Sequence, residues 1–492
     1  MNVNPITRLD YPDPDVIRVE DTYYMVSTTM HFMPGCEILQ SFDLVHWEHV
    51  TYVYETLDHT DAQQLKSGQN IYGQGMWAAS LRYHEGRFFI CFVANDTRKT
   101  YLYTSEKIDG PWKKQLIEGF YHDGSLLFDE DGRNYIVYGN DEIWITELNE
   151  DLTAPKKDGL HRLLVSDHKN PELGYEGAHI QKINGYYYIF LIHSLRDRWM
   201  RTEACFYSDS LEGEFTGGDV LCDDRGYCGQ GVAQGGIVDT PDGKWYAMLF
   251  QDSGAVGRIP ILLPVTWKDH FPFFGQNGHV PEEIEVHSTR PGYIYQPLVG
   301  SDDFCNGLLP RWQFNHDPDP RYYHLDALQG TYTITTREVC TELTQAVNTL
   351  TQRMSYPSCA AEVTVDASAL KEGDVAGLCA LQSCYAAVGI TKHHGKYEVL
   401  MLDKKEDGIL DMTEGTVVES HQMDFRLEAD FCNMKDEARC YYRVNKGDWL
   451  PIGTVHKLYF KLDHFTGCRF GLFCYAAEET GGSACFRDFK YY

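Results

Sequence analysis

The sequence predicts an all-β protein in which a five-bladed β-propeller is followed by a β-sandwich. Aromatic residues make up 13% of the 492 residues, and tyrosine and phenylalanine favour β-strands. One strand–turn–strand pattern recurs five times between residues 12 and 250, and no helical period of any length is present. Shorter alternating strands with polar turns occupy the rest of the chain.

Each repeat joins a short apolar strand to an aromatic-rich strand through a tight polar turn. The repeats are "PDPDVIRVEDTYYMVS", "WAASLRYHEGRFFICFV", "DGSLLFDEDGRNYIVYG", "EGAHIQKINGYYYIFLI" and "QGGIVDTPDGKWYAMLF". Their turns carry Asp21, Gly86, Gly132, Gly185 and Gly243, which are residue types that tight hairpins require. The turns recur every 46 to 65 residues, enough for about four strands each. This spacing favours propeller blades over a generic all-β protein with hairpins.

The second domain begins after a connector that contains proline and glycine. We place the propeller, as catalytic domain, at residues 1–297 and the sandwich at 298–492, with the connector "EVHSTRPGYIYQPLVGSDDF" across the boundary. Segments such as "TYTITT", "AAEVTVDA", "YEVLMLD" and "FGLFCYA" alternate as sandwich strands do. The alternatives are a detached sugar-binding module and a domain packed on the propeller.

The acidic balance of the chain excludes several classes of partner. The net charge is −29, from 72 acidic and 43 basic residues. Nucleic acids and anionic membranes select basic surfaces, so we expect neither. A neutral oligosaccharide substrate is compatible with this charge, and so is a homo-oligomer.

The cysteines and the start of the chain indicate the compartment. Fifteen cysteines, an odd number without CxxC spacing, fit neither a full disulfide set nor a zinc framework. The stretch "MNVNPITRLDYPDPD" lacks the basic and apolar regions of a signal peptide, and no apolar run approaches about 18 residues. We therefore expect a reduced, cytoplasmic protein.

Alignment of the repeats on their turns brings five residues into one equivalent position. Nine residues before the turn glycine stand Trp77, Asp123, Glu176 and Gln234, and Asp13 is their equivalent in the first repeat, whose turn is one residue shorter. Equivalent positions near the start of the innermost strands ring the axis of a propeller. We expect these side chains to face one another across a funnel.

Three carboxyl groups in such a funnel suit the cleavage of a glycosidic bond. One protonated carboxyl protonates the leaving oxygen, and an ionised one activates water or attacks the anomeric carbon. A third carboxylate raises the pKa of the acid by repulsion. Trp77 offers an apolar wall for a sugar face. The alternative is that the acids cap strand ends or hydrate the channel.

Several motifs, in order, resemble glycoside hydrolase family 43, the five-bladed-propeller β-xylosidases and α-L-arabinofuranosidases. They are "YPDPDVIRVEDTYYM", "GMWAASLRYHEGRFF", "YHDGSLLFDEDGRNY", "YEGAHIQKINGYYYI" and "GAVGRIPILLPVTW". The stretches "SDDFCNGLLPRWQFN", "NTLTQR", "GDVAGL" and "GLFCYAAEETGGSACFRDFKYY" are similar to the concanavalin-like β-sandwich appended to many members. The resemblance thus covers the whole chain and implies that the sandwich packs on the propeller and contributes to the pocket rim.

The resemblance also implies catalytic roles and inversion of the anomeric centre. Asp13 would be the general base, Glu176 the general acid, and Asp123 the pKa modulator. Asp15 stands where the family usually has a small residue. We expect it to be a solvated residue at the start of its strand, with a supporting electrostatic role as the alternative.

Further substrate-binding residues follow from the same resemblance. Arg258 matches a pocket-floor arginine that hydrogen-bonds sugar hydroxyls, and the alternative is a surface arginine. Phe32 and Met30 fall where members place pocket-lining aromatics, although both suit an ordinary core. Many members carry a histidine in the fifth repeat, sometimes as a calcium ligand, whereas this chain has Gln234, which we expect to hydrogen-bond a substrate hydroxyl or an axial water instead. We expect no required cofactor or metal, and the motif does not support a structural calcium ion.

These observations lead to one preferred function and several rivals. The preferred one is an inverting exo-glycosidase that hydrolyses terminal β-1,4-linked xylose from xylo-oligosaccharides. The close alternative is an α-L-arabinofuranosidase that removes arabinose from arabinoxylan or arabinan fragments. A non-catalytic carbohydrate-binding propeller and a retaining transferase acting on fructosides are the alternatives from other classes.

Overall fold

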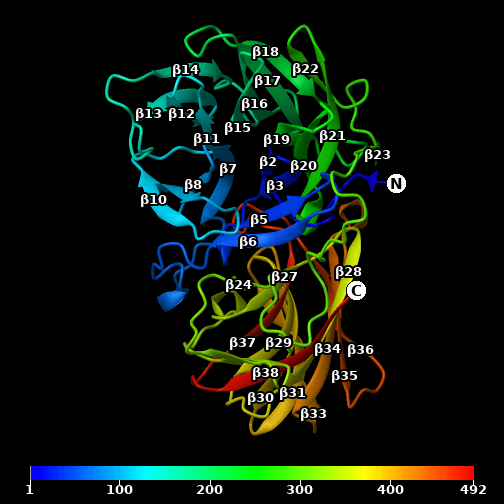
Figure 1. Cartoon of the computed structure of the whole chain (residues 1–492). Helices are drawn as coiled ribbons and strands as arrows, with labels where there is room; N and C mark the ends of the chain where they lie inside the picture. Colours follow the sequence, from blue (N-terminus) through cyan, green and yellow to red (C-terminus); the bar gives the residue numbers. More distant parts are fainter. Residues whose placement is uncertain (1) are drawn as a thin grey trace.

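The computed structural model describes residues 2–492 and contains a propeller and a β-sandwich. The propeller lies above the sandwich in Figure 1. Five four-stranded antiparallel sheets of the described residues form the blades, and each blade takes its strands in chain order. The innermost strand of every blade comes first. The blades are β2 (Asp15–Val19), β3 (Thr22–Val26), β5 (Gly35–Ser41) and β6 (Glu48–Tyr54); β7 (Met76–His84), β8 (Arg87–Ala94), β9 (Lys99–Ser105) and β10 (Lys113–Ile117); β11 (Ser125–Phe128), β12 (Asn134–Asn140), β13 (Glu142–Leu148) and β14 (His161–Ser166); β15 (Glu176–Ile183), β16 (Tyr186–Ser194), β17 (Arg201–Ser208) and β18 (Thr216–Leu221); and β19 (Val232–Asp239), β20 (Trp245–Asp252), β21 (Arg258–Lys268) and β22 (Phe271–Phe274).

Aromatic and β-branched residues on neighbouring blades bury one another, as the repeats predict. The core between blades one and two includes Ile38, Tyr54 and Phe92, and that between blades four and five includes Phe190 and Ile261. The short strands β1 (Asn2–Val3) and β23 (Glu283–Ile284) pair beside the fifth blade. They hold the start of the chain against the end of the propeller.

Two sheets form the sandwich, so the all-β prediction of a propeller followed by a concanavalin-like sandwich is confirmed. One sheet contains β24 (Gln313–Asn315), β27 (Leu350–Arg353), β29 (Val375–Leu381), β30 (Ala386–His393), β31 (Lys396–Lys404), β32 (Leu410–Met412), β33 (Thr416–Val418) and β37 (Arg469–Tyr475). The other contains β25 (Tyr323–Asp326), β26 (Thr331–Thr335), β28 (Ser358–Asp366), β34 (Gln422–Asp430), β35 (Glu437–Val444), β36 (Leu450–Lys457) and β38 (Ser483–Tyr491).

Helical structure within residues 2–492 is limited to four 3-10 turns. They are η1 (Lys66–Gly68), η2 (Gly254–Val256), η3 (Leu343–Gln345) and η4 (Cys432–Met434). None of them has the length or hydropathy needed to cross a membrane.

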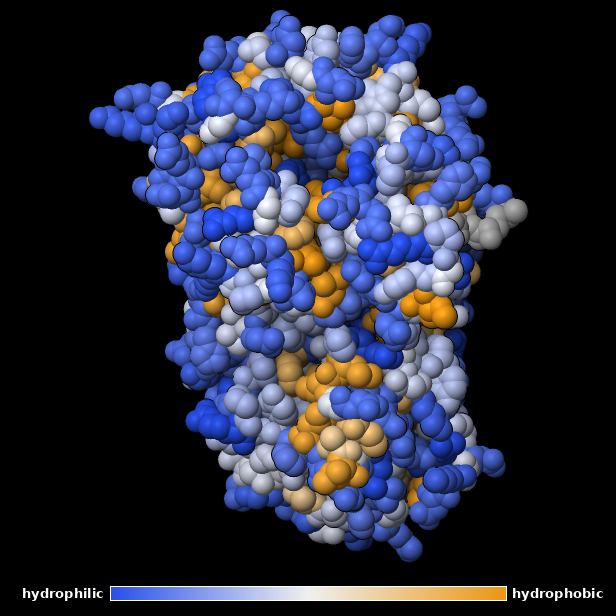
Figure 2. Space-filling model, viewed as in Figure 1, coloured by the Kyte–Doolittle hydropathy of each residue, from blue (hydrophilic) through white to orange (hydrophobic). Residues whose placement is uncertain are grey.

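The two domains share one sheet. The short strand β4 (Phe32–Met33) leaves the first blade and pairs with β24 of the sandwich, with Phe32 opposite Asn315. Nearby, Arg353 of the sandwich donates hydrogen bonds to Glu37 at 2.8 Å and to the backbone carbonyl of Asp10 at 2.9 Å. The sandwich is therefore built into the propeller rather than detached. On the face shown in Figure 2, hydrophobic side chains form a discontinuous band from the propeller onto the sandwich.

A left-handed residue recurs at the start of the innermost strands and aims side chains into the funnel. Asp13 and Asp123 have φ angles of 52° and 48°, and Gln234 has 62°. The second and fourth blades use Gly75 and Gly177 instead, with φ angles of 79° and 65°. Register shifts follow in blades two, four and five, as in β-bulges that redirect a strand. This local geometry places the five aligned positions around the axis.

Candidate active site

Asp13 lies at the top of the first blade and is 5% exposed. Its Oδ1 pairs with Nη1 of Arg258 at 2.9 Å, and its Oδ2 accepts a hydrogen bond from the Thr28 hydroxyl at 2.5 Å. Arg258 begins β21, and Thr28 follows β3. Two donors from different blades thus orient this carboxylate.

His122 brings the other two predicted acids together. Its Nε2 lies 3.5 Å from Oδ2 of Asp123 and 3.6 Å from Oε2 of Glu176. Asp123 accepts a hydrogen bond from the backbone N–H of Gly177 at 3.1 Å, and Glu176 accepts one from the Asn140 amide at 2.7 Å. Two carboxyl groups and one imidazole from adjacent blades therefore form a single cluster.

Charge and burial shift the titration of this cluster. Burial raises the pKa of Asp123 to about 6, and the charges of Glu176 and Asp13 add to this rise, whereas His122 opposes it. The Asp123 carboxylate raises the pKa of His122 to about 9, with smaller contributions from Glu176 and Asp13. Near neutral pH His122 is therefore a cation between carboxylates. In such a close group the bound protons belong to the cluster rather than to one residue.

The sandwich supplies one wall of the site through Phe465. Its ring centroid lies 5.5 Å from that of Trp77, and the Arg258 guanidinium carbon lies 4.3 Å above the Phe465 ring. Asp10 ties the two domains together here, because its carboxylate accepts hydrogen bonds from the backbone N–H groups of Arg258 and Gly467, both at 2.8 Å. The Arg258 side chain is buried and belongs to the site, not to the surface.

Several buried donors of the site have no partner within the described chain. Nε and Nη2 of Arg258 and the indole N–H of Trp77 are buried and have no hydrogen-bond partner among residues 2–492. Buried donors are seldom left unpaired in a folded protein. They adjoin the carboxyl groups, because the same guanidinium pairs with Asp13 and the Trp77 ring packs against the His122 ring, with 5.8 Å between their centroids.

Two of the predicted substrate-binding residues lie elsewhere than we expected. Phe32 is fully buried in the core between the domains, with the Arg469 guanidinium carbon 3.4 Å above its ring, so it offers no face to a sugar. Met30 is also buried and forms an isolated bridge to Met76. Both follow the ordinary core alternative, because β4 turns away from the funnel to join the sandwich sheet.

Gln234 stays at the predicted position of the fifth blade. It is 4% exposed, and its backbone N–H donates a hydrogen bond to Glu203 at 2.7 Å. A Cβ atom at Gly177 would lie 2.7 Å from the Gln234 amide carbon, so the residue beside Glu176 has to be glycine. Gln234 therefore packs directly against the segment that carries Glu176.

Asp15 is not the solvated residue that we expected. It is 1% exposed, forms an ion pair with Arg82 at 2.8 Å and is hydrogen-bonded to Nδ1 of His179 at 3.1 Å. Burial opposes its ionisation, but these two partners and the backbone N–H of Leu81 outweigh burial and lower the pKa of Asp15. The funnel side of the innermost strands excludes water at this depth, which the sequence pattern alone does not reveal.

Other contacts of the site were also absent from the sequence-based prediction. His122 directly precedes Asp123, so its place beside the acids was open to inference from the motif "YHDGS". Thr28, Asn140 and Phe465 carry no such signal, because they come to the site from three distant parts of the chain: the loop after β3, the end of β12 and a loop of the sandwich.

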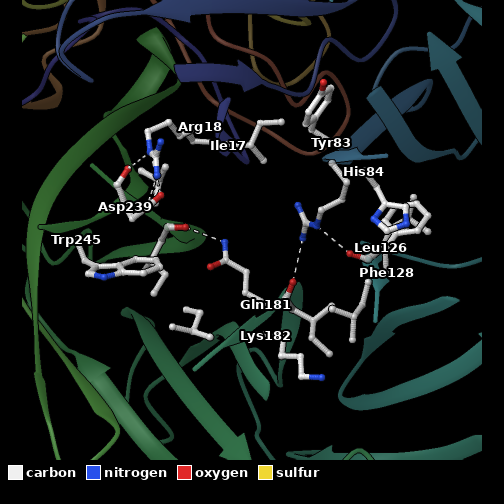
Figure 3. Close-up of a pocket in the computed structure, with 17 residues that line it drawn as sticks. Ile17, Arg18, Tyr83, His84, Leu126, Phe128, Gln181, Lys182, Asp239 and Trp245 are labelled. Carbon is white, nitrogen blue, oxygen red and sulfur yellow. Dashed lines mark hydrogen bonds and ion pairs between the residues drawn. The ribbon is translucent and has the colours of Figure 1, made fainter. Parts of the chain in front are cut away.

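A cavity of 410 Å³ lies at the other end of the innermost strands. It is lined by residues of all five blades that follow the site residues in sequence, and Figure 3 shows Gln181 and the Arg18–Asp239 pair at its wall. Gln181 donates a hydrogen bond to the Ile237 carbonyl at 2.7 Å. None of the predicted site residues lines this cavity.

The cluster of His122, Asp123 and Glu176 is the only group in residues 2–492 whose arrangement could hold a metal ion, with one atom of each residue within 4.8 Å of the others. A cation would first have to displace the proton of His122, whose pKa of about 9 favours the imidazolium. Gln234 offers no imidazole at the fifth blade. The donor set therefore fits a charged carboxyl cluster better than a resident metal.

The fold and the carboxyl cluster together define a propeller glycoside hydrolase. The chain belongs to the glycosyl hydrolases family 43, whose sequence model matches residues 3–272. Residues 301–492 match the β-xylosidase C-terminal concanavalin A-like domain. The resemblance inferred from the motifs is thereby confirmed.

Relatives in this family carry two kinds of activity in their names. A β-xylosidase of Formosa agariphila is 26% identical over 98% of this chain and 88% of its own length. A non-reducing-end α-L-arabinofuranosidase of Bacteroides ovatus is 24% identical over 83% of this chain and 79% of its own length.

A solved structure described as a bifunctional GH43-CE protein of Bacteroides eggerthii is 42% identical over all of this chain, with a TM-score of 0.93. The present chain spans 63% of that protein.

Proposed function

We propose that this protein is an inverting exo-glycosidase that releases terminal β-1,4-linked xylose from xylo-oligosaccharides. The observation that carries the proposal is that Asp123 and Glu176 flank His122, that the charge of Asp13 acts on the same cluster, and that Asp13 pairs with the buried Arg258. The names of the relatives support the choice of a pentose. The proposed substrate and the proposed roles of the residues rest on the site geometry and on the names of the relatives together.

Asp13 acts as general base in the proposed reaction. Arg258 and Thr28 hold its carboxylate as an acceptor, so that it can take a proton from a water molecule. The oxygen of that water bonds to the anomeric carbon from the face opposite the leaving group. The configuration at this carbon is inverted in a single displacement.

Glu176 acts as general acid on the leaving group. It gives its proton to the glycosidic oxygen as the bond to the anomeric carbon breaks. The Asn140 amide donates a hydrogen bond to Glu176 and orients its carboxyl group, and Asp123 lies on the other side of His122. His122 balances the charge of the cluster.

The wall formed by Phe465 and Trp77 supports exo-action. Together with Arg258 it bounds the pocket on the side of the sandwich. A bounded pocket admits a terminal sugar more readily than the middle of a chain. Arg258 donors suit vicinal hydroxyl groups of that sugar.

α-L-Arabinofuranosidase activity is the second candidate, favoured by the name of the Bacteroides ovatus relative. The test is kcat/KM on 4-nitrophenyl β-D-xylopyranoside and 4-nitrophenyl α-L-arabinofuranoside, measured side by side. A preference for the xyloside supports the first candidate, and a preference for the arabinoside supports the second. Hydrolysis of neither glycoside would overturn both. Proton NMR of the first-formed anomer separates inversion from retention.

The compartment and the cofactor requirement remain part of this proposal. Cysteines from residue 36 to residue 485 are all free, which supports a reducing, cytoplasmic location. Carboxyl groups alone supply the proposed acid and base, so we propose that no cofactor or metal is required.

A further inference from the structure

The second aspartate of "YPDPDVI" lies at the centre of a buried polar network below the site. Oδ2 of Asp15 accepts hydrogen bonds from Nη1 of Arg82 at 2.8 Å and from the Leu81 backbone N–H at 2.7 Å. Its Oδ1 lies 3.1 Å from Nδ1 of His179. Arg82 also donates to the Ser125 hydroxyl at 2.7 Å, and this hydroxyl accepts from the backbone N–H of Ile180 at 3.0 Å.

The network joins the strands that carry the proposed catalytic carboxyl groups. Asp15 follows Asp13 by two residues, and Ser125 stands in the same relation to Asp123. His179 follows Glu176 by three residues, across the register shift of β15. Two residues of chain span at most about 7 Å, so each contact below the site constrains a carboxyl group above it.

Arg82 closes the network toward the cavity at the other end of the channel. Besides Asp15 and Ser125, its guanidinium donates to the backbone carbonyls of Leu126 at 2.8 Å and Ile180 at 3.2 Å. Arg82 therefore separates the acids from this cavity and ties blades one, two, three and four to one another.

The network also contributes charge to the site. Asp15 and Arg82 form a buried pair of opposite charges, with His179 on the other carboxylate oxygen. From the fifth blade Gly236 packs against His179 and adds no charge. Along the chain, Asp13, Asp123 and Glu176 precede the network residues Asp15, Ser125 and His179, with His122 and Arg258 beside these acids, and Arg18, which pairs with Asp239, follows Asp15.

We propose that Asp15, Arg82 and His179 are positioning residues that set the spacing and the electric potential of the three catalytic carboxyl groups. This proposal rests on the proposed glycosidase function. It assigns a role to the whole "DPD" motif, since Asp13 reacts while Asp15 holds the strand and balances Arg82.

Removal of the negative charge of Asp15 and removal of the positive charge of Arg82 should move the pH–activity profile in opposite directions. Asp15→Asn keeps the shape of the side chain but leaves Arg82 unbalanced. Its positive potential favours ionised carboxyl groups, so both limbs of the profile should move to lower pH by roughly one unit. Arg82→Gln leaves Asp15 unbalanced, so both limbs should move to higher pH. The double variant has a neutral network, and its limbs should return toward those of the wild type.

The experiment measures kcat and KM on the preferred 4-nitrophenyl pentoside between pH 4 and 9, with thermal unfolding as the check of folding. Relaxed spacing should lower kcat in both single variants by about 10- to 100-fold with little change in KM. Asp129→Asn is the matched control, because Asp129 is another buried carboxylate. It follows β11 in blade three and pairs with Lys182 of blade four at 2.6 Å. The control variant should lose stability and keep the wild-type profile.

The outcomes separate this proposal from the proposed function. If the wild type hydrolyses neither pentoside, the proposed function fails and this role fails with it. If the wild type is active and folded Asp15→Asn and Arg82→Gln variants keep its profile and kcat, only the positioning role is overturned. Shifts in the same direction in both variants would also overturn it. If one single variant does not fold, the direction in which the pH–activity profile of the other variant shifts decides the question. If neither folds, a lowered kcat of the double variant supports the positioning role, and a wild-type kcat refutes it.

Discussion

Phe465 of the sandwich packs against Trp77 of the second blade, with 5.5 Å between their ring centroids. The two residues are nearly four hundred positions apart in the chain. The same Phe465 ring lies under the Arg258 guanidinium, which in turn pairs with Asp13. A residue of the second domain thus packs directly against two site residues of the first.

Replacement of Phe465 by alanine should weaken the binding of the terminal sugar. The substitution removes the wall beside Trp77 and the cation–π contact to Arg258, so kcat/KM should fall by about 10-fold, mainly through KM. Steady-state kinetics on the preferred pentoside measure this effect. Leu462→Ala is the matched control, since Leu462 lies in the same loop and is 73% exposed. Equal kinetics for the Phe465→Ala variant and the wild type would contradict the role of this wall.

Glu176→Gln should lose activity in a way that depends on the leaving group. A general acid contributes about 10²- to 10⁴-fold, and that help is needed least by a good leaving group. We expect the full loss on xylobiose and a much smaller loss on 2,4-dinitrophenyl β-D-xylopyranoside. Asp13→Asn is the comparison, because loss of the base should slow both substrates alike. Equal losses on both substrates for Glu176→Gln would argue against its role as general acid.

His122→Asn should move the acid limb of the pH–activity profile. The His122 cation lowers the pKa of Asp123 against the effect of burial, so its removal should raise that pKa above about 6. Protonation of the cluster then begins at higher pH, and the acid limb should shift upward by roughly one unit. The profile of kcat/KM reports this shift. His84→Asn, at the other end of the channel, should leave the limb in place.

Three buried histidines should make the domain interface sensitive to acid. The ring centroid of His31 lies 4.8 Å from that of His316 and 5.0 Å from that of His464. Burial lowers the pKa of His464 to about 3 and holds those of His31 and His316 well below 6.5. All three stay neutral in the fold and take up protons only on unfolding. Stability should therefore fall as the pH drops below about 6.5, by about 1.4 kcal/mol for each histidine at pH 5.5.

The measurement for this interface is the melting temperature between pH 7.5 and 5. His464→Phe has no proton to gain on unfolding, so its curve should be less steep than that of the wild type. His394→Phe is the control, because His394 is exposed. Parallel curves for His464→Phe and the wild type would refute the assignment.

Chelation should leave the activity unchanged. The His122 cation occupies the one arrangement of residues 2–492 that could hold a metal, and Gln234 replaces the histidine expected at the fifth blade. Dialysis against EDTA should keep kcat/KM at the untreated value, and added Ca²⁺ should not raise it. Loss with EDTA and recovery with Ca²⁺ would show that an ion is needed.

The sequence by itself determined the architecture and the positions of the three acids. Five copies of one hairpin pattern predict the propeller, because each blade must bury its neighbour's apolar face. Alignment on the turns places Asp13, Asp123 and Glu176 at equivalent points of their strands, and equivalent points of a closed ring face its axis. Periodicity along the chain is sufficient for such inferences.

Only the tertiary structure decided what surrounds these acids. Phe465 reaches the pocket from the second domain, and Phe32 leaves it to join the sandwich sheet. Asp15 is buried and ion-paired although its local pattern suggests a solvated residue. These outcomes depend on contacts between segments that are far apart in the chain, and burial and charge balance arise from the packed whole. A local pattern contains no record of either.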